Sequence, residues 1–353
     1  MQSVFDELYE NSLAKCEFKN LISIITAEEN IRLAYRNLKK NAGSRTPGTD
    51  GKTIADLAKM SEPELIGFVQ QKFNWYQPQS VRRKEIPKGN GKTRPLGIPT
   101  IMDRLIQQCV LQVMEPICEA KFCETSNGFR PNRGVENALA QAEKHMQKSN
   151  LHIVIDIDIK GFFDNVNHGK LLRQIWAMGI HDKKLLSIIS AMLKAEVAGI
   201  GFPEKGTPQG GILSPLLSNI VLNELDWWIT SQWVGMPTRH EYSGKIHENG
   251  TKDQSKKYRE LRKTNLKECY IVRYADDFKI FCRKHSDAVK LFEATRAWLK
   301  ERLGLDISPE KSKIVNLKHA YSDFLGFRIK VHKGKRNQYV VISHCLLYTS
   351  DAA

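Results

Sequence analysis

Two adjacent carboxylates, Asp276 and Asp277, lie inside the segment 270–283, which reads YIVRYADDFKIFCR. Runs rich in aromatic and β-branched residues, 270–274 and 278–282, flank them, which is typical of two antiparallel strands joined by a tight turn. Like charges placed side by side among apolar strands cost free energy unless a cation neutralises them, and a hard divalent cation is the usual partner. The alternative is a solvated hairpin turn, in which Asp is common.

A second acidic segment, IVIDIDI at 153–159, favours the metal interpretation. Alternation with a period of two places Asp156 and Asp158 on one face of a strand and the isoleucines on the other. The segment continues into KGFFD, so the acids lie where a strand gives way to a turn and a helix. If this strand lies beside the hairpin, three carboxylates converge, enough to hold two Mg²⁺ ions about 3.5–4 Å apart for in-line phosphoryl transfer.

The composition limits the class of protein. The 353 residues suffice for two or three subdomains, and a hydrophobic content of 41% is ordinary for a globular protein. The formal net charge of +15 indicates a polyanionic partner, most simply nucleic acid, although excess Lys could also serve solubility alone. The sequence has no signal pattern and no run as long as a membrane span, so we predict a soluble, cytoplasmic protein. The seven scattered cysteines lack zinc-ligand spacing, which predicts reduced core thiols.

Two further segments are expected to position ligands. The segment 81–100, VRRKEIPKGNGKTRPLGIPT, is typical of a basic β-hairpin that grips phosphates or is simply solvated. A helix with an apolar stripe, which is most simply core, is expected after it. The segment 206–219, GTPQGGILSPLLSN, predicts a loop with exposed backbone, followed by a helix with Ser214 as N-cap and Pro215 in its first turn.

The other segments carry less chemical information. The first forty residues have a helical pattern, with Thr26 and Glu29 as a capping box. Further helices are expected at 168–178 and 182–194, and His168 is more typical of a cap or a polar surface residue than of a catalytic base. The Lys-rich segment 235–268 predicts a polar insertion that leads into a short charged helix. Strands are expected at 311–314, 324–327 and 339–342.

Taken in order, IVIDIDIKGFFD, GTPQGGILSPLLSN and YIVRYADD resemble the palm motifs of reverse transcriptases. Four more segments resemble the reverse transcriptase/maturase proteins encoded by bacterial group II introns: NAGSRTPGTDG, IPKGNGKTRPLGIPTIMDRLIQQ, SNGFRPNRG and SDFLGF. The resemblance covers roughly residues 26–330. It implies an α+β right-hand polymerase fold, with an antiparallel-sheet palm flanked by helices and with mixed, mainly helical fingers.

The resemblance also implies an activity and partners. The expected enzyme is an RNA-directed DNA polymerase, a nucleotidyltransferase that adds deoxynucleotides to a primer 3′-hydroxyl with the help of two Mg²⁺ ions. Its expected partners are the intron RNA, an RNA template, a DNA primer or target DNA, and dNTPs. Binding of the intron RNA would assist splicing.

Site residues follow from the same resemblance. Asp158, Asp276 and Asp277 match the catalytic, metal-binding carboxylates, and Ile159 lends a backbone carbonyl. Asp156 is then an extra acid without a catalytic role.

The resemblance further implies a nucleotide-binding set, which comprises Lys88, Arg94, Phe163, Gln209 and Gly210. The two basic residues would hold the incoming triphosphate, and the aromatic ring would clash with a ribose 2′-hydroxyl. The Gln-Gly pair would pack by the nascent base pair. Either Lys311 or Lys313 corresponds to the family's lysine near the leaving pyrophosphate, and the spacing does not decide between them.

The resemblance divides the chain into six parts. They are an N-terminal fingers segment (1–80), fingers with the basic hairpin (81–150), a first palm part (151–234), the polar insertion (235–268), a second palm part (269–342) and a tail of uncertain origin (343–353). Full family members continue into a helical thumb with maturase function, so the sequence as given is expected to be truncated, with poor processivity and impaired splicing. Alternative functions are an RNA-binding splicing maturase without polymerase activity, or a reverse transcriptase of the retron or diversity-element type. A nucleotide cyclase with a similar palm would lack the basic finger loops and the Pro-Gln-Gly-Gly segment.

Overall fold

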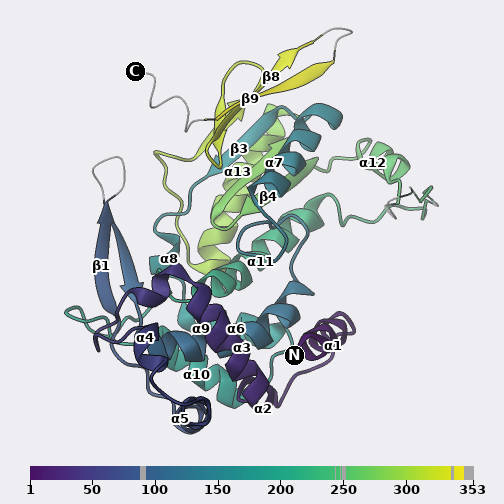
Figure 1. Cartoon of the computed structure of the whole chain (residues 1–353). Coiled ribbons are helices and arrows are strands. Elements are labelled where there is room, and N and C mark those ends of the chain that lie inside the picture. Colours follow the sequence, from purple (N-terminus) through teal and green to yellow (C-terminus); the bar gives the residue numbers. More distant parts are fainter. Residues whose placement is uncertain (88–92, 243, 247, 249–251, 335–337, 346–353) are drawn as a thin grey trace. The chain divides into compact units, whose positions relative to one another are not determined.

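The computed structural model describes residues 1–353 except 88–92, 243, 247, 249–251, 335–337 and 346–353 (Figure 1). It combines helices with antiparallel sheets, so the expected α+β class is confirmed. The chain separates into two compact units, of which the first comprises 1–122, 161–221 and 303–305 and the second comprises 123–160, 222–302 and 306–353. Over the described part of the chain, no helix is both long enough and apolar enough to cross a membrane.

The first unit is built around α6 (Ile101–Glu119). The residues of the predicted apolar stripe are almost completely buried, which confirms it as core, and α1, α2 and α3 pack against α6. The helical elements of this unit are α1 (Gln2–Leu13), α2 (Leu21–Ile25), α3 (Glu28–Lys40), η1 (Ala42–Arg45), α4 (Ile54–Leu57), α5 (Glu62–Asn74), α8 (Phe162–Asn165), α9 (His168–Ala177) and α10 (Lys183–Leu193). The expected helices at 168–178 and 182–194 are therefore present.

Helix α6 also fixes the loop that precedes it in the chain. The guanidinium of Arg104 donates hydrogen bonds of 2.7 Å to the carbonyl oxygens of Gly43 and Thr46. A Cβ atom at Gly48 would lie 2.6 Å from the Cα of Thr100, so only glycine allows this approach. The segment NAGSRTPGTDG is therefore a packed loop, held by the start of α6.

The basic hairpin is present as β1 (Arg82–Pro87) and β2 (Thr93–Ile98), paired antiparallel. Two predicted caps are wrong. Helix α3 begins after Ala27, and the hydroxyl of Thr26 instead donates to the carbonyl of Ile22. Ser214 is the first residue of α11 (Ser214–Gln232), and its hydroxyl donates to the carbonyl of Pro208 at 2.8 Å. In both cases a carbonyl within reach competes with the expected cap for the hydroxyl.

The second unit contains a four-stranded antiparallel sheet in the order β4-β5-β3-β6. A second sheet has the order β7-β8-β9, and a helix of the predicted insertion, α12, follows the described part of the polar loop. The elements of this unit are α7 (Val135–Glu143), η2 (Lys144–Lys148), β3 (Ile153–Ile157), α12 (Ser255–Leu261), β4 (Cys269–Tyr274), β5 (Asp277–Cys282), α13 (His285–Trp298), η3 (Leu299–Leu303), β6 (Lys313–Asn316), β7 (Ser322–Phe324), β8 (Phe327–Lys333) and β9 (Tyr339–Cys345). The last residue of η3 belongs to the first unit.

One hydrophobic core joins both sheets and α7. Val154 and Phe281, from neighbouring strands of the first sheet, meet Phe324 and Ile329 from the second, and α13 packs against β3, β5 and β6. The expected strand at 324–327 is wrong, because Leu325 and Gly326 form the turn between β7 and β8 with positive φ angles of 53° and 81°. The twist of a two-residue hairpin favours such a turn over a continuous strand. Strand β9 also extends past the expected end at 342.

We expect Phe281→Ala to lower the free energy of unfolding by about 3–5 kcal/mol, because it empties a fully buried site between the two sheets. Urea denaturation of the full chain measures the change. Val340→Ala on the exposed side of β9 is the matched control and should change the stability by less than about 0.5 kcal/mol. Equal effects of the two substitutions would contradict this placement of the core.

Candidate active site

Three acids from distant segments line one pocket of about 550 Å³ in the second unit: Asp158, Asp276 and Asp277. The register of the sheet explains their convergence, because Ile157 of β3 pairs with Phe278 of β5. One further step along this antiparallel register brings Asp158 opposite Asp277. The pairing of β3 with β5 therefore brings together two acids that are more than one hundred residues apart in the sequence.

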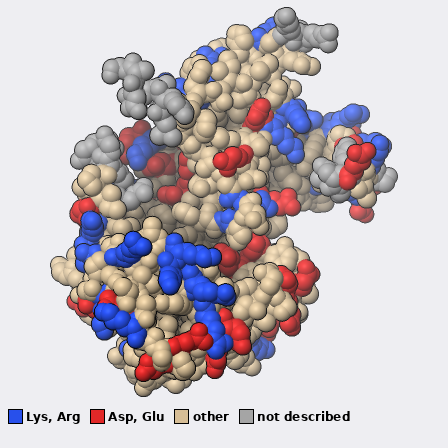
Figure 2. All heavy atoms as spheres, viewed as in Figure 1, with Lys and Arg blue, Asp and Glu red and all other residues tan. Residues whose placement is uncertain are grey.

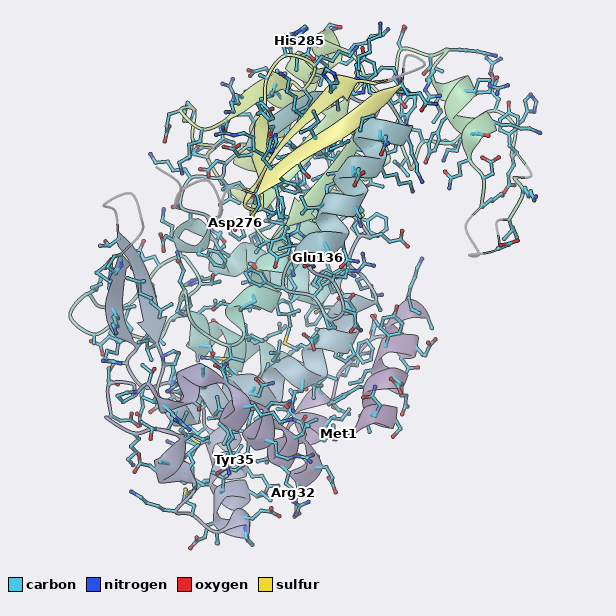
Figure 3. The ribbon with its side chains drawn as sticks, turned by 45° about the horizontal axis from the view of Figure 1, so that its top comes forward. Met1, Arg32, Tyr35, Glu136, Asp276 and His285 are labelled. Atoms are coloured by element: carbon cyan, nitrogen blue, oxygen red, sulfur yellow. The ribbon has the colours of Figure 1, made fainter. Side chains whose placement is uncertain are left out.

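The turn of the hairpin carries Asp276 (Figure 3). Tyr274 pairs with Asp277, so the turn has two residues, Ala275 and Asp276, rather than the expected three. Ala275 has a φ angle of 55°, in the left-handed region that residues other than glycine rarely adopt. Its conformation costs free energy, which the surrounding structure must offset.

Asp158 is held by residues of the segment that precedes β6. Its carboxylate accepts a hydrogen bond of 2.7 Å from the hydroxyl of Ser308 and lies 3.2 Å from the ammonium of Lys311. The side chain of Asp158 is 42% exposed, so this ion pair contributes little stability and can be exchanged for another cation. Both Lys311 and Lys313 line the pocket, and Lys311 is the one in contact with Asp158.

Asp156 lies in a buried ion pair with Lys279, its neighbour across the sheet. The hydroxyl of Ser322 on β7 donates to Asp156 and accepts from Lys279, each at 2.8 Å. The ammonium of Lys279 also lies 5.2 Å from the centre of the Phe324 ring. Asp156, which also lines the pocket, is therefore charge-compensated by Lys279, whereas Asp158 faces Lys311 and solvent.

Burial raises the pKa of Asp277 to about 6. The cation of Lys279 opposes this rise, and the carboxylates of Asp156 and Asp276 add to it. Asp277 is exposed on the side that faces the pocket, so water there screens part of the effect. The pocket lining itself holds six carboxylates and three lysines, so its negative groups outnumber its cations.

The donor set fits a hard divalent cation, since the side chains that could bind one are carboxylates. Asp323 and Glu310 also line the pocket. Within the described residues, no group of three or more Asp, Glu, His or Cys side chains is arranged to hold an ion by itself. Mg²⁺ is usually bound by one or two carboxylates together with water and substrate phosphates, so a substrate would complete its shell here.

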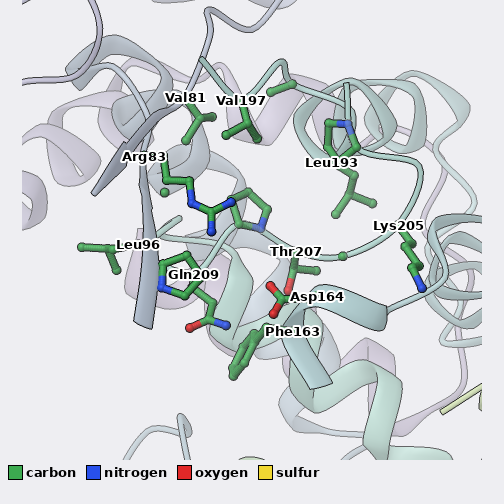
Figure 4. A pocket seen from close by; sticks show the side chains of 16 residues that line it. Val81, Arg83, Leu96, Phe163, Asp164, Leu193, Val197, Lys205, Thr207 and Gln209 are labelled. Atoms are coloured by element: carbon green, nitrogen blue, oxygen red, sulfur yellow. The ribbon is translucent and has the colours of Figure 1, made fainter. Parts of the chain in front are cut away.

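A second candidate pocket, of about 150 Å³, lies in the first unit (Figure 4). Phe163 on α8 lines it, and the carbonyl of Phe163 accepts a hydrogen bond of 2.7 Å from the amide of Thr207. Gln209 lines the same pocket, and its carbonyl accepts a hydrogen bond from the amide of Gly97 on β2. A Cβ atom at Gly210, whose φ angle is 109°, would lie 2.6 Å from the carbonyl oxygen of Gly97. The Gln-Gly pair thus packs directly against the basic hairpin.

The remaining predicted site residues are placed only in part. Lys88 lies outside the described residues, and Arg94 lies on β2 opposite Ile86, with a side chain that is not described. Ile159 is buried and pairs with Ile307. The structure thus brings the three acids together in one unit, and Phe163 with the Gln-Gly loop in the other.

Some residues around these pockets were missed or misjudged from the sequence. Lys279 follows Asp277 by two residues on the same strand. The alternation of side chains therefore already placed this cation on the same face as Asp277. Ser308 has no such signal. His168 was expected at a cap or on the surface, but it is buried, and its Nε2 donates to the carbonyl of Gly206 at 2.7 Å. Its burial, which lowers its pKa, follows from packing against the loop that carries Gln209.

Comparison with known proteins agrees with this geometry. Residues 86–329 match the family described as reverse transcriptase (RNA-dependent DNA polymerase). Protein YkfC of Escherichia coli K12 is 32% identical, over 92% of this chain and 86% of its own length. The group II intron-encoded protein LtrA of Lactococcus lactis subsp. cremoris is 33% identical, over 94% of this chain and 60% of its own length.

A COX1/OXI3 intron 2 protein of Saccharomyces cerevisiae is 28% identical, over 96% of this chain and 42% of its own length. The chain therefore spans less than two thirds of these two intron-encoded relatives. The matched region contains every acid of the pocket, strand β2 and the last two residues of β1. The chain belongs to the reverse transcriptase family, and it is similar to a group II intron-encoded protein over 60% of that protein's length.

Proposed function

We propose that this chain is the polymerase part of a group II intron protein and adds deoxynucleotides to a primer 3′-hydroxyl on an RNA template. One observation carries the proposal. In a member of the reverse transcriptase family, Asp158, Asp276 and Asp277 line a single pocket although they are far apart in the sequence. Phosphoryl transfer requires positioned charge rather than a covalent intermediate, and this pocket supplies the charge.

The proposed architecture is that of a right hand. The palm would comprise 151–234 and 269–342, with the acids at one end of its antiparallel sheet. The fingers would comprise 1–80 and 81–150, and the insertion 235–268 would lie apart from the chemistry. The antiparallel order β4-β5-β3-β6 supports the palm, because it puts the β4–β5 turn and the end of β3 at the same end of the sheet.

The proposed metal ligands are the three carboxylates and the backbone carbonyl of Ile159. Two bound Mg²⁺ ions would lower the pKa of the primer hydroxyl and neutralise the triphosphate. Asp158 would exchange its contact with Lys311 for a metal ion, which is inexpensive because the pair is exposed. Lys311 would then be free to stabilise charge on the leaving pyrophosphate.

The proposed nucleotide contacts come from the fingers and the second pocket. Lys88 and Arg94 would hold the triphosphate, as cations suit phosphate oxygens. Phe163 would stand against the 2′ position of the sugar, and Gln209 with Gly210 would lie by the nascent base pair. The support for this assignment is that Phe163 and Gln209 line one cavity and that the carbonyl of Phe163 accepts a hydrogen bond from the amide of Thr207, two residues before Gln209.

The proposed partners are polyanions: an RNA template, intron RNA and a DNA primer or target. The formal charge of +15 supports this, because phosphate contacts release counterions and strengthen binding at low salt. Lys and Arg side chains gather on the face of the first unit that Figure 2 shows, interspersed with acids. Relatives named as intron-encoded proteins support the intron RNA as one of these partners.

Asp276→Ala should lower Mg²⁺-dependent primer extension on poly(rA)/oligo(dT) by at least about 10³-fold, because it removes a carboxylate that neutralises the reacting groups. RNA binding, measured by filter retention, should change little, since the fold and the basic surfaces remain. Asp158→Ala should behave alike.

Glu260→Ala is the matched control for this assay, because it removes an exposed carboxylate on α12, outside the pocket. It should retain wild-type extension. Undiminished extension by Asp276→Ala would refute the site. Absence of extension by the wild type, with RNA binding intact, would instead favour a splicing maturase without polymerase activity.

Phe163→Val should weaken the discrimination against ribonucleotides by up to about 10²-fold, because a smaller side chain leaves room for a 2′-hydroxyl. The measurement is the ratio of kcat/KM for dTTP and UTP. Phe162→Leu, at the buried neighbour, is the control and should leave this ratio unchanged. A ratio unaffected by Phe163→Val would remove Phe163 from the sugar site.

Divalent-metal binding should weaken as the pH falls through about 6, because the raised pKa leaves Asp277 increasingly protonated below that value. Competition by one proton predicts a loss of up to about tenfold per pH unit. Mn²⁺ binding followed by electron paramagnetic resonance measures it. Asp277→Asn should bind more weakly above this pH and show a flatter profile. A wild-type affinity that is constant from about pH 5 to about pH 8 would contradict the assignment.

A further inference from the structure

Arg273, on the strand that leads into the acidic turn, is completely buried together with its partner Asp226 on α11. The guanidinium donates through Nε to both carboxylate oxygens of Asp226, at 2.9 and 3.0 Å. Its Nη2 donates to Asp226 and to the hydroxyl of Ser126, at 2.6 and 2.7 Å. Burying a guanidinium away from water costs free energy, and these hydrogen bonds to a carboxylate and a hydroxyl offset that cost.

Another hydrogen bond of this guanidinium reaches the turn itself. Nη1 of Arg273 donates a 2.7 Å hydrogen bond to the carbonyl oxygen of Ala275. Ala275 is the residue with the left-handed backbone, and it directly precedes Asp276. Arg273 therefore holds the peptide group that determines where the Asp276 side chain begins.

The loop 125–128 holds the same turn from another direction. The amide of Asn127 donates to the carbonyl of Arg273 at 2.8 Å, and the amide of Arg273 donates to the carbonyl of Thr125 at 2.9 Å. A Cβ atom at Gly128 would lie 2.3 Å from the amide nitrogen of Ala275, so glycine is required there. Part of the segment SNGFRPNRG, basic in composition, thus serves as a backbone support for the hairpin.

We propose that Arg273, anchored by Asp226, is a positioning residue that holds the strained Ala275 turn and so presents Asp276 and Asp277 to the pocket. The proposal rests on the proposed polymerase site and adds a residue to it that touches neither metal nor substrate. A buried ion pair is often replaceable by apolar residues without loss of stability. Stability alone therefore does not explain why this pair is charged. The hydrogen bond from Arg273 to the Ala275 carbonyl does, because an apolar residue could not make it.

The test compares variants of the full chain. The double variant Arg273→Met with Asp226→Leu removes both charges of the pair and fills a similar volume, but it releases the Ala275 carbonyl. The buried cation of Arg130, which also acts on Asp226, keeps its hydrogen bonds to the carbonyl oxygens of Cys123 and Ser126. Arg273→Lys keeps the charge and loses the planar fork. Arg283→Met is the matched control, because Arg283 pairs with Glu268 and with the carbonyl of Ser149 at the open end of the same hairpin.

Three measurements separate positioning from stability: urea denaturation, Mn²⁺ binding by electron paramagnetic resonance, and kcat and KM for dTTP in primer extension. The double variant should unfold cooperatively, bind Mn²⁺ about 10–100-fold more weakly and lose kcat by a similar factor, with KM for dTTP within about threefold. Arg273→Lys should show a smaller loss of the same kind. Arg283→Met should lose some stability and keep both Mn²⁺ binding and kcat.

Wild-type Mn²⁺ affinity and kcat in the folded double variant would overturn the proposal. If the double variant does not fold, Arg273→Lys decides, and wild-type values in that folded variant would overturn it as well. Equal losses in Arg283→Met would also overturn it, because the effect would then belong to the hairpin as a whole. If the wild type binds Mn²⁺ without extending primers, the polymerase proposal fails while the Mn²⁺ comparison still tests Arg273.

Discussion

The antiparallel pairing of β3 with β5 is the contact on which the candidate site depends. It brings Asp158 to the hairpin turn and so concentrates like charges at one end of a sheet. Such an arrangement is unfavourable unless positive groups lie nearby, and the second unit provides them on both faces of the hairpin. Lys279 projects from one face toward Asp156, and Arg273 projects from the other toward Asp226. Each pair is completed by a serine hydroxyl, from Ser322 and Ser126 respectively.

These buried pairs divide the acids into two kinds. Asp156 and Asp226 already have protein cations as partners, and their role is to fix strands and turn. The acids at the pocket are compensated incompletely, because six carboxylates and three lysines line it. A cation supplied from solution is the natural remedy for that imbalance. The distinction separates Asp156, in its buried ion pair with Lys279, from Asp158, which lies two residues later and contacts the exposed Lys311.

A second recurring feature is the close packing of a loop backbone against the backbone of a hairpin. In the first unit Gly210 lies against Gly97 of the basic hairpin, and in the second Gly128 lies against Ala275 of the acidic turn. In each case a Cβ atom would collide with main-chain atoms, so the loop motif and the strand motif constrain each other. Motifs that look independent along the chain are therefore parts of single packed arrangements. This accounts for the glycines in both loops without a direct role in chemistry.

The sequence by itself determined the local elements: both hairpins, the long buried helix, and the helices at 168–178 and 182–194. These follow from period, turn residues and charge, which act over a few residues. The tertiary structure alone decided the register that unites Asp158 with Asp277, the burial of His168, and the loss of the expected caps at Thr26 and Ser214. It also decided that Leu325 and Gly326 form a turn rather than a strand. These outcomes depend on which groups meet after folding, because hydrogen-bond competition and desolvation are set by neighbours distant in the chain.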